Sequence, residues 1–303
     1  MAEKKRVIAL GFFDGVHRGH GLLLSKTRER ASEFGAVPSV LSFDVHPDTL
    51  VFNRDVKLLN SADDRKELIR RFYGIDDVVF LHFDRHTMEM LWKEFIDTVV
   101  SELNVCRIVV GEDFRCGYRG EGKAELIRTY CESLGIGCDI LPALCEGGRV
   151  VSSTWIRELI QNGELEKAEK LLGHPHTLSD TVRPGFQLGR KLGTPTINMA
   201  FPAGVLLPKF GVYAARVYLE NGERYYAVTN IGVRPTVRNG EKVSVESHLL
   251  DFSGDLYGQK ARVEFLKFLR PEIKFESTEE LSRQIWLDTE NAKEFFDQKT
   301  EVS

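Results

Sequence analysis

Two closely spaced histidines near the N-terminus are the first side chains whose types and spacing suggest chemistry. They lie in the segment GFFDGVHRGH (residues 11–20), which follows a short apolar run. A strand that passes through glycines into a helix directs backbone N–H groups and the helix dipole at one point, which suits a phosphate. His17 and His20 are three apart, so they share one face of that helix start and could donate hydrogen bonds to a triphosphate. Gly19 lets a nucleotide approach the backbone; two capping histidines in an ordinary turn are the alternative.

A second set of polar residues lies in the C-terminal half, where a glycine-rich bend leads into an extended segment. The bend comprises Gly185 and the run 189–195. Thr196 and Asn198 are two apart, so in a strand both side chains point to one side. Their hydroxyl and amide oxygens suit Mg²⁺ bound together with nucleotide phosphates. A solvated strand edge after a proline turn is the alternative.

One carboxylate, Glu246, lies in a later segment of alternating polarity. The alternation places Val243, Val245 and Leu249 on one face of a strand and Glu246 with His248 on the other. A carboxylate that faces a cavity can accept the proton of a substrate hydroxyl as it attacks a γ-phosphorus. The alternative is a glutamate in a surface salt bridge.

Up to about residue 172, short β-branched runs alternate with helical patterns. We expect strands over residues 7–10, 37–43, 78–83 and 107–111, and helices over residues 22–34, 68–72, 88–103 and 124–134. In the third helix, Leu91, Phe95, Val99 and Leu103 are spaced by four and should form its apolar face. This order predicts a parallel sheet with helices on both faces, and ligands beyond the carboxyl ends of its strands.

Beyond Gly173, extended segments separated by turn signals replace the helical periodicity. Seven of the ten prolines lie there, and strands are expected over residues 213–219, 224–231, 243–250 and 261–269, with Asn-Gly turns at 221–222 and 239–240. Ser277 and Thr278 are candidate N-caps, and Glu280 completes a capping box with Ser277, so a helix should close the chain. The sequence thus predicts a small antiparallel β-barrel with a terminal helix, and domains of residues 1–175 and 176–303.

Length and composition indicate a two-domain protein and argue against several classes of protein. A chain of 303 residues with 42% hydrophobic content has room for two domains with their own cores. The 41 basic and 45 acidic residues leave no polybasic field for nucleic acid or a membrane surface. No run approaches 18 apolar residues and the N-terminus lacks a signal-peptide apolar region, so a cytoplasmic location is expected. Five cysteines without a C-x-x-C pair indicate reduced thiols: Cys106, Cys116, Cys131, Cys138 and Cys145.

Three further patterns are set aside. The run GYRGEGKA (residues 117–124) fits the spacing of a P-loop, but it ends in Ala124 where a Ser or Thr would hold Mg²⁺. His82 with His86, and His174 with His176, lack a third ligand at a useful spacing, so surface histidines are expected instead of metal sites.

The N-terminal motif resembles the nucleotidyltransferase superfamily with its H-x-G-H signature. The longer string over residues 11–20 is similar to the bacterial bifunctional riboflavin kinase/FAD synthetase family. That family has a second phosphate motif, which SSTWIR (residues 152–157) resembles at an expected helix start; an ordinary N-cap run is the alternative. The resemblance also implies that SFDVHP (residues 42–47) and GEDFRCGY (residues 111–118) line flavin and adenine pockets.

This resemblance implies specific residues. The implied catalytic residues are His17, His20 and Arg157. The implied ATP-binding residues are Gly11, Phe12, Asp14, Gly15, His17, Gly19, His20, Ser152, Ser153, Thr154 and Arg157. The implied flavin-binding residues are Phe43, His46, Pro47, Asp113 and Phe114. Cys116 and Lys123 depart from the family pattern in the adenine and flavin segments.

The C-terminal half resembles riboflavin kinase, whose P-T-x-N signature matches residues 195–198, with Ile197 where alanine is common. NIGVRPT (residues 230–236) and VESHLLDF (residues 245–252) are also similar to that family. The resemblance casts Glu246 as the catalytic base and Thr196 and Asn198 as the metal ligands. It implies that ATP and flavin contact Gly185, Gly189, Arg190, Gly193, Thr194, Asn230 and Arg234.

The resemblance covers roughly residues 7–296 and implies two Mg²⁺-dependent reactions. The C-terminal domain would phosphorylate riboflavin with ATP to give FMN. The N-terminal Rossmann-like domain would transfer AMP from ATP to FMN, giving FAD and pyrophosphate. Two alternatives remain: a flavin-binding regulator or paralogue that retains only one activity, and an adenylyltransferase for a different phosphate ester.

Overall fold

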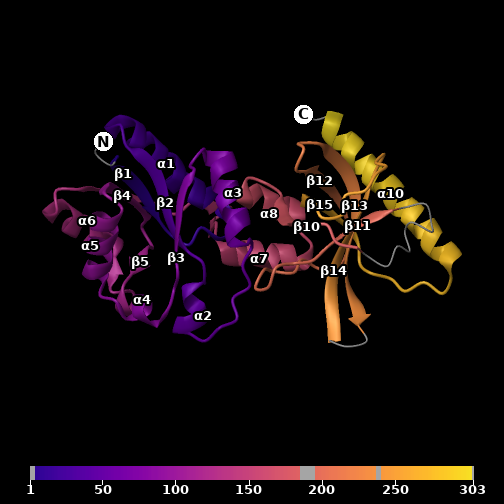
Figure 1. The fold of residues 1–303 in the computed structure, drawn as a ribbon, viewed down its shortest axis with the longest axis horizontal. Coiled ribbons are helices and arrows are strands. Elements are labelled where there is room, and N and C mark those ends of the chain that lie inside the picture. The colour runs from indigo at the N-terminus through magenta and orange to yellow at the C-terminus, as the bar shows by residue number, and fades with distance from the viewer. Residues whose placement is uncertain (1–3, 185–194, 237–239, 302–303) are drawn as a thin grey trace. The chain divides into compact units, whose positions relative to one another are not determined.

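The structure is a computed structural model that describes residues 4–184, 195–236 and 240–301. The chain forms two compact units, Met1–Ser153 and Thr154–Ser303. Figure 1 shows the elements of each unit with their labels.

The N-terminal unit is built on a parallel sheet of five strands in the order β3-β2-β1-β4-β7. The strands are β1 (Arg6–Leu10), β2 (Val37–Phe43), β3 (Asp77–Leu81), β4 (Val105–Gly111) and β7 (Gly137–Leu141). From β1 the chain moves outward through β2 and β3, and then crosses to the other side of β1 to form β4. The strand order therefore reverses between β1 and β4, which is where open parallel sheets bind ligands at their carboxyl edge. The predicted parallel α/β sheet is confirmed.

Helices cover both faces of this sheet, as the alternation of apolar side chains requires. On one face α1 and α3 pack against Val7, Ala9 and Val40, and on the other α5 and α6 pack against Ile8 and Leu10. The helices of the unit are α1 (Arg18–Phe34), α2 (Pro47–Val51), α3 (Ala62–Tyr73), α4 (Arg85–Glu89), α5 (Trp92–Glu102) and α6 (Ala124–Ser133), with 3-10 turns η1 (Asp14–Val16) and η2 (Tyr118–Gly120). Two short hairpins complete it, β5 (Arg115–Cys116) with β6 (Gly122–Lys123) and β8 (Cys145–Glu146) with β9 (Arg149–Val150).

The expected single helix over residues 88–103 is wrong. The structure has two helices there, α4 and α5, separated by Met90 and Leu91. The carbonyl of Met90 accepts the N–H of Tyr118 at 2.7 Å, which a continuous helix would not leave free, and Leu91 is 60% exposed where the spacing placed it on the buried face. Two other helices begin earlier than expected: α1 begins at Arg18 because His17 caps it, and α3 begins at Ala62 because Ser61 caps it. The expected helix over residues 124–134 is present as α6 and ends one residue earlier, at Ser133.

The C-terminal unit contains an antiparallel sheet of six strands in the order β10-β15-β12-β13-β14-β11. The strands are β10 (His176–Thr181), β11 (Thr196–Met199), β12 (Gly211–Leu219), β13 (Arg224–Thr236), β14 (Gly240–Leu249) and β15 (Lys260–Arg270). A single antiparallel bridge between Arg183 and Asn198 joins the two edges of the sheet. The predicted small antiparallel barrel is confirmed, and this bridge is its seam.

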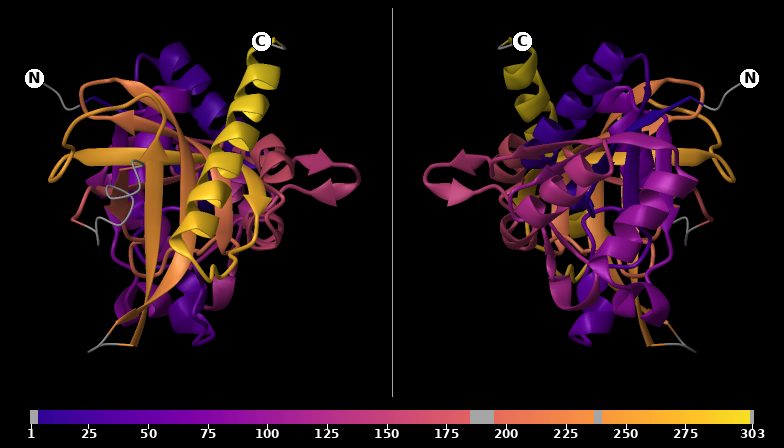
Figure 2. Two further views of the ribbon diagram at one scale, coloured as in Figure 1. Left: turned by 90° about the vertical axis from the view of Figure 1, so that its right-hand side faces the viewer. Right: turned by 90° about the vertical axis from the view of Figure 1, so that its left-hand side faces the viewer.

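The terminal helix α10 (Thr278–Glu301) lies along the outside of this sheet, as the left view of Figure 2 shows for the yellow helix and the orange strands. Its Ala292, Phe295 and Phe296 pack against Ala214 and Leu266 of the sheet. The Ser277 hydroxyl accepts the Glu280 N–H, as the capping box predicted, but the Glu280 carboxylate accepts the N–H of Glu276 instead of that of Ser277.

Two helices, α7 (Ser153–Asn162) and α8 (Leu165–Leu172), precede the barrel. The last turn of α8 ends at Gly173 with a φ of 83°, and α8 packs against β10 and β15. The compact units thus divide at the start of α7. Division of the chain into domains at residue 175 stays a prediction.

Candidate functional sites

The two histidines of the first motif lie stacked at the start of α1. Their ring centroids are 3.6 Å apart with an interplanar angle of 15°. His17 is the N-cap, and its Nδ1 accepts the backbone N–H of His20 at 3.3 Å. In a neutral imidazole the proton then resides on Nε2, which leaves the His17 Nε2–H as a donor. The predicted shared face is therefore present.

His20 is held as a neutral imidazole. Burial lowers its pKa well below the usual range, and the positive charges of His17 and Arg65 lower it further. Its Nδ1 is buried and has no hydrogen-bond partner within the described chain. A buried nitrogen without a hydrogen-bond partner costs free energy. A ligand that forms a hydrogen bond with this ring would remove that cost.

The loop between β1 and α1 has a strained backbone. Phe13 and Val16 have φ values of 56° and 43°, and Gly15 has 77°. A β-branched residue such as valine rarely adopts positive φ, and each such residue costs about 1–3 kcal/mol. The buried Asp14 carboxylate fixes the loop by accepting the N–H of Leu59 at 2.8 Å.

Gly11 and Gly19 lie close to the aromatic rings of Phe13 and His17. A Cβ on Gly19 would lie 3.1 Å from the His17 ring, and one on Gly11 would lie 3.0 Å from the Phe13 ring. Larger residues at either position would therefore displace the rings that shape the loop.

The predicted flavin-binding residues lie after β2 and β4, at the same edge of the sheet. Phe43 ends β2, and its ring meets the ring of Phe83 edge-on at 5.2 Å. His46 caps α2, in which Pro47 is the first residue, and its ring lies edge-on to Phe12 of the histidine loop at 4.6 Å. Asp113 and Phe114 follow β4; Asp113 is exposed and Phe114 packs against the core.

The second phosphate motif is partly joined to the first. The Ser153 hydroxyl donates to the carbonyl of Asp14 at 2.9 Å, so this motif and the histidine loop meet directly. Ser152 precedes α7, whereas Thr154 and Arg157 lie within it, on the second compact unit. The participation of Thr154 and Arg157 in this site stays a prediction.

Sequence reasoning missed Arg65, which lies beneath the loop with 0% of its surface exposed. A signal was present, because Arg65 lies three and four residues before the buried Leu68 and Ile69 and thus on the apolar side of α3. A charge on the buried stripe of a helix is unusual enough to mark a candidate site residue.

Polar residues of the C-terminal unit form one row across three strands of the barrel. Glu246 of β14 is in register with Asn198 of β11 on one side and with Asn230 of β13 on the other, and Asn230 is in register with Val212 of β12. Residues in register project from the same face of a sheet. In the next row Thr196 is in register with His248. Val245 and Leu249 are buried on the opposite face, so the predicted alternation in β14 is confirmed.

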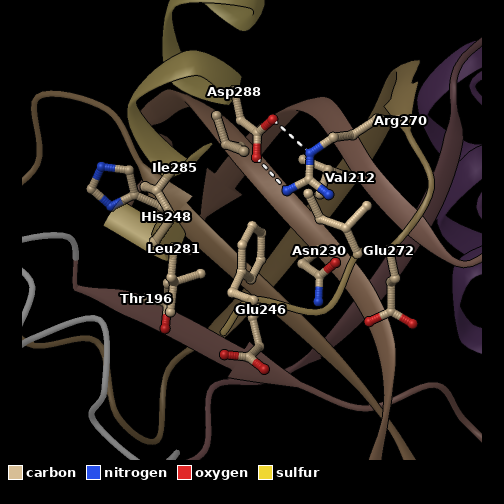
Figure 3. A pocket seen from close by; sticks show the side chains of 13 residues that line it. Thr196, Val212, Asn230, Glu246, His248, Arg270, Glu272, Leu281, Ile285 and Asp288 are labelled. Carbon is tan, nitrogen blue, oxygen red and sulfur yellow. Dashed lines mark hydrogen bonds and ion pairs between the residues drawn. The ribbon is translucent and has the colours of Figure 1, made fainter. Parts of the chain in front are cut away.

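A cavity of about 260 Å³ lies over Glu246 and Asn230 of this row. Figure 3 shows the side chains that line it. Glu246, Asn230, Thr196 and His248 form its polar wall. Its apolar wall comes from the sheet, from the segment before α10 and from α10 itself: Val212, Val228, Ile273, Phe275, Leu281 and Ile285. A flat aromatic ring with a polar chain would match such a cavity. Asn198 lines an adjoining cavity that shares Thr196.

A bidentate ion pair closes one end of this cavity. Arg270 donates from Nε and Nη2 to the two carboxylate oxygens of Asp288, at 2.8 and 2.7 Å. Gln284 donates to the same carboxylate at 2.9 Å. The pair joins β15 to α10 and was not predicted from the sequence, because no spacing rule links residues 18 apart on different elements.

The remaining predicted kinase residues lie where the structure does not describe side chains. Gly185, Gly189, Arg190, Gly193 and Thr194 lie outside the described residues, as does the turn at Asn239. Arg234 belongs to β13, of which only the backbone is described at that position.

Two family models match the chain in the order of its two units. The FAD synthetase model matches residues 1–155 and the riboflavin kinase model matches residues 172–296. The bifunctional riboflavin kinase/FMN adenylyltransferase of Listeria monocytogenes is 35% identical over 293 residues, covering 96% of this chain and 92% of its own. The enzyme of that name from Haemophilus influenzae is 37% identical over 292 residues, covering 95% and 94%. The chain belongs to the bifunctional riboflavin kinase/FMN adenylyltransferase family.

A solved structure is similar to nearly the whole of this chain. A crystal structure from Streptococcus pneumoniae, named macrolide-efflux protein, has a TM-score of 0.82 and 27% identity, covering 97% of this chain and 95% of its own. That name describes drug efflux, whereas the relatives with higher identity carry the name of the flavin enzyme. No helix within the described residues is long and apolar enough to cross a membrane.

The family departures at Cys116 and Lys123 lie outside the loops that hold the histidines. Cys116 is half-buried, and burial raises the pKa of its thiol to about 12, so it is not a reactive thiolate at neutral pH. Within the described residues no three His, Cys, Asp or Glu side chains are grouped to hold a metal.

Proposed function

We propose that this chain carries both activities of its family. The C-terminal barrel phosphorylates riboflavin with ATP to give FMN, and the N-terminal unit adenylylates FMN with a second ATP to give FAD and pyrophosphate. The substrates are small molecules, namely riboflavin, FMN and ATP. A cytoplasmic location is part of this proposal, supported by five cysteines that are all free.

In the kinase reaction we assign Glu246 as general base. The hydroxyl at the end of the ribityl chain attacks the γ-phosphorus of ATP, its proton moves to the Glu246 carboxylate, and ADP leaves. Asn230 beside Glu246 orients the hydroxyl, and the apolar wall of the cavity receives the flavin ring.

The residues beside Glu246 fit Mg²⁺. Asn198 at the end of the polar row supplies an amide oxygen and Thr196 in the next row supplies a hydroxyl. Mg²⁺ takes few protein ligands when nucleotide phosphates provide the rest. When bound, Mg²⁺ neutralises charge that develops on the transferred phosphoryl group. Asn198 is only 9% exposed, so its amide is held in one place.

In the adenylyl transfer, an oxygen of the FMN phosphate attacks the α-phosphorus of ATP. A new oxygen–phosphorus bond forms as the bond to the β-phosphate oxygen breaks, and pyrophosphate leaves. His17 and His20 donate hydrogen bonds to the phosphate oxygens, which gain charge in the transition state. The helix start of α1 adds backbone N–H groups and the positive end of its dipole.

One observation carries the proposal: each unit has its own constellation, the stacked pair His17–His20 in one and the row Asn198–Glu246–Asn230 in the other. A flavin-binding regulator would need neither the histidine pair nor the polar row. An adenylyltransferase for another phosphate ester would not need the second.

The test is incubation of the full chain with riboflavin, ATP and Mg²⁺, with FMN and FAD separated by chromatography. We expect FMN to appear first and FAD to follow, with one pyrophosphate released per FAD. A second incubation starts from FMN, so that the two reactions are measured independently. FMN without FAD would indicate a paralogue with one activity, and flavin binding without turnover would indicate a regulator.

A further inference from the structure

A buried arginine lies beneath the histidine loop and has no part in the reaction described above. Arg65 is fully buried, and a buried guanidinium is costly unless its charge and donors are compensated. Burial lowers its pKa to about 10, and the nearby carboxylates of Asp14 and Asp44 act in the opposite direction. Arg65 therefore remains a cation at neutral pH.

One nitrogen of Arg65 joins two loops. Its Nη1 donates to the carbonyl of Phe12 at 2.8 Å, to the hydroxyl of Ser42 at 2.8 Å and to the carbonyl of Phe43 at 3.0 Å. The Ser42 hydroxyl donates to the same Phe12 carbonyl at 2.8 Å. The guanidinium also lies over the Phe12 ring, 4.2 Å from its centroid.

These contacts connect the two halves of the adenylyl-transfer site. Phe12 belongs to the loop after β1, which we assign to ATP, and Ser42 and Phe43 end β2, which leads into the segment assigned to the flavin. Besides Nη1, Arg65 has two buried nitrogens, Nε and Nη2, without hydrogen-bond partners in the described structure. The Arg65 guanidinium is thus buried although two of its nitrogens form no hydrogen bond. Packing alone does not explain why a cation occupies this position.

We propose that Arg65 is a positioning residue for adenylyl transfer, which fixes the ATP loop against the flavin strand and so sets the distance between the attacking phosphate and the α-phosphorus. The proposal rests on the adenylyl transfer proposed above. A reaction between two bound substrates depends steeply on this distance, because a misplacement of about 1 Å costs about 10²-fold in rate.

The charge of Arg65 provides a second readout. The cationic groups that act on His20 are His17 and Arg65, while Asp14 and Asp44 face Arg65. Removal of the Arg65 charge should therefore raise the pKa of His20, whereas a variant that keeps a positive charge at residue 65 should not.

The experiment compares Arg65→Met and Arg65→Lys in the full chain, with FMN and ATP as substrates. We expect Arg65→Met to lower kcat for FAD formation by about 10- to 10²-fold, with KM for ATP and FMN changed by less than about threefold. Arg65→Lys keeps the charge but not the three contacts, so its loss should be smaller. The acidic limb of the kcat profile should move to higher pH in Arg65→Met and stay in place in Arg65→Lys.

The matched control is Arg70→Met, an exposed arginine on the same helix that pairs with Glu67. It should leave kcat, KM and the pH profile unchanged. Ser42→Ala removes one of the three acceptors and keeps the cation, so it should lower kcat several-fold without moving the pH profile. This variant keeps the proposal testable if Arg65→Met does not fold.

Two results would overturn the proposal. A rise in KM for ATP with kcat unchanged would make Arg65 a direct ATP ligand. A rate that is normal per folded molecule, with only the thermal midpoint lowered, would make it a structural residue. If the parent protein makes no FAD from FMN, the proposed function itself fails, and this is seen before any variant is compared.

Discussion

In the proposed adenylyl transfer His20 donates as a neutral imidazole from the first turn of α1, where burial makes a hydrogen bond to developing charge strong. His20→Ala removes that donor and should lower FAD formation from FMN by about 10²- to 10³-fold. FMN formation from riboflavin should be unchanged, because the kinase residues lie in the other unit. The measurement is the initial rate of each product with its own substrate.

The control for this variant is His86→Ala, a histidine of α4 outside the loop. It should keep both rates. Equal loss of FMN and FAD formation in His20→Ala would refute the assignment of separate sites.

Glu246 differs from a surface glutamate in its neighbours, because it has an asparagine in register on each side and faces a cavity. Glu246→Gln keeps the size of the side chain and removes proton acceptance. FMN formation should fall by about 10²- to 10⁴-fold, while riboflavin binding, measured by flavin fluorescence, should change little.

Supplied with FMN, the same variant should make FAD at nearly the parent rate. Glu223→Gln changes an exposed glutamate at the β12–β13 turn and should alter neither rate. Normal kinase activity in Glu246→Gln would mean that another group accepts the proton.

His176 makes the stability of the barrel depend on pH. It is buried at the start of β10 against Phe265, its Nε2 has no partner within the described residues, and burial lowers its pKa to about 3. The expectation that His174 and His176 are surface histidines is therefore wrong, because both are buried. The unfolded chain binds a proton at His176 below about pH 6.5, but the folded protein does not. The stabilisation is therefore complete above about pH 6.5 and is lost as the pH falls from there toward 3.

The limiting slope for one such proton is about 1.4 kcal/mol per pH unit. His176→Leu should flatten the decline of the free energy of unfolding between pH 6.5 and 5, measured by urea titration at each pH. His86→Leu, which removes a histidine that is not buried, should leave the decline as in the parent. Parallel curves for His176→Leu and the parent would show that this histidine does not titrate as described.

At the scale of elements, α10 lines the cavity that contains Glu246 and also covers the sheet. Asp288→Asn weakens the bidentate pair with Arg270 and should destabilise the C-terminal unit by about 1–3 kcal/mol. Because Arg270 lines the cavity, KM for riboflavin should also rise. The matched variant Asp297→Asn lies on an exposed position of the same helix and should change neither quantity.

The elements were predictable where the pattern was local. The strand over residues 37–43 follows from a short β-branched run, the faces of β14 follow from alternation, and the histidine pair follows from helical spacing. The break between α4 and α5 was not predictable, because it depends on a hydrogen bond from Tyr118 to Met90 across the fold. The same holds for Arg65, whose three acceptors come from two loops that are distant in the sequence.

At the scale of the molecule, the two activities should be separable as fragments. Residues 154–303 and 176–303 both contain the barrel, but only the first retains α8, whose Leu165, Leu171 and Leu172 are buried. Both fragments should form FMN if they fold, and residues 154–303 should have the higher thermal midpoint. A well-folded 154–303 fragment without kinase activity would show that the barrel is not sufficient for FMN formation.

The strand β14 has a consequence for how this protein can vary in evolution. Its buried face holds Val245 and Leu249, and its other face presents Glu246 and His248. The same two-residue alternation therefore orients both the core side chains and the proposed catalytic side chain. An insertion or deletion of one residue within the strand would move the side chains beyond it to the opposite face. Such a change would bury the carboxylate and expose the apolar residues at the same time. Selection for a folded barrel alone therefore preserves the orientation of Glu246, even in a descendant that no longer needs its chemistry.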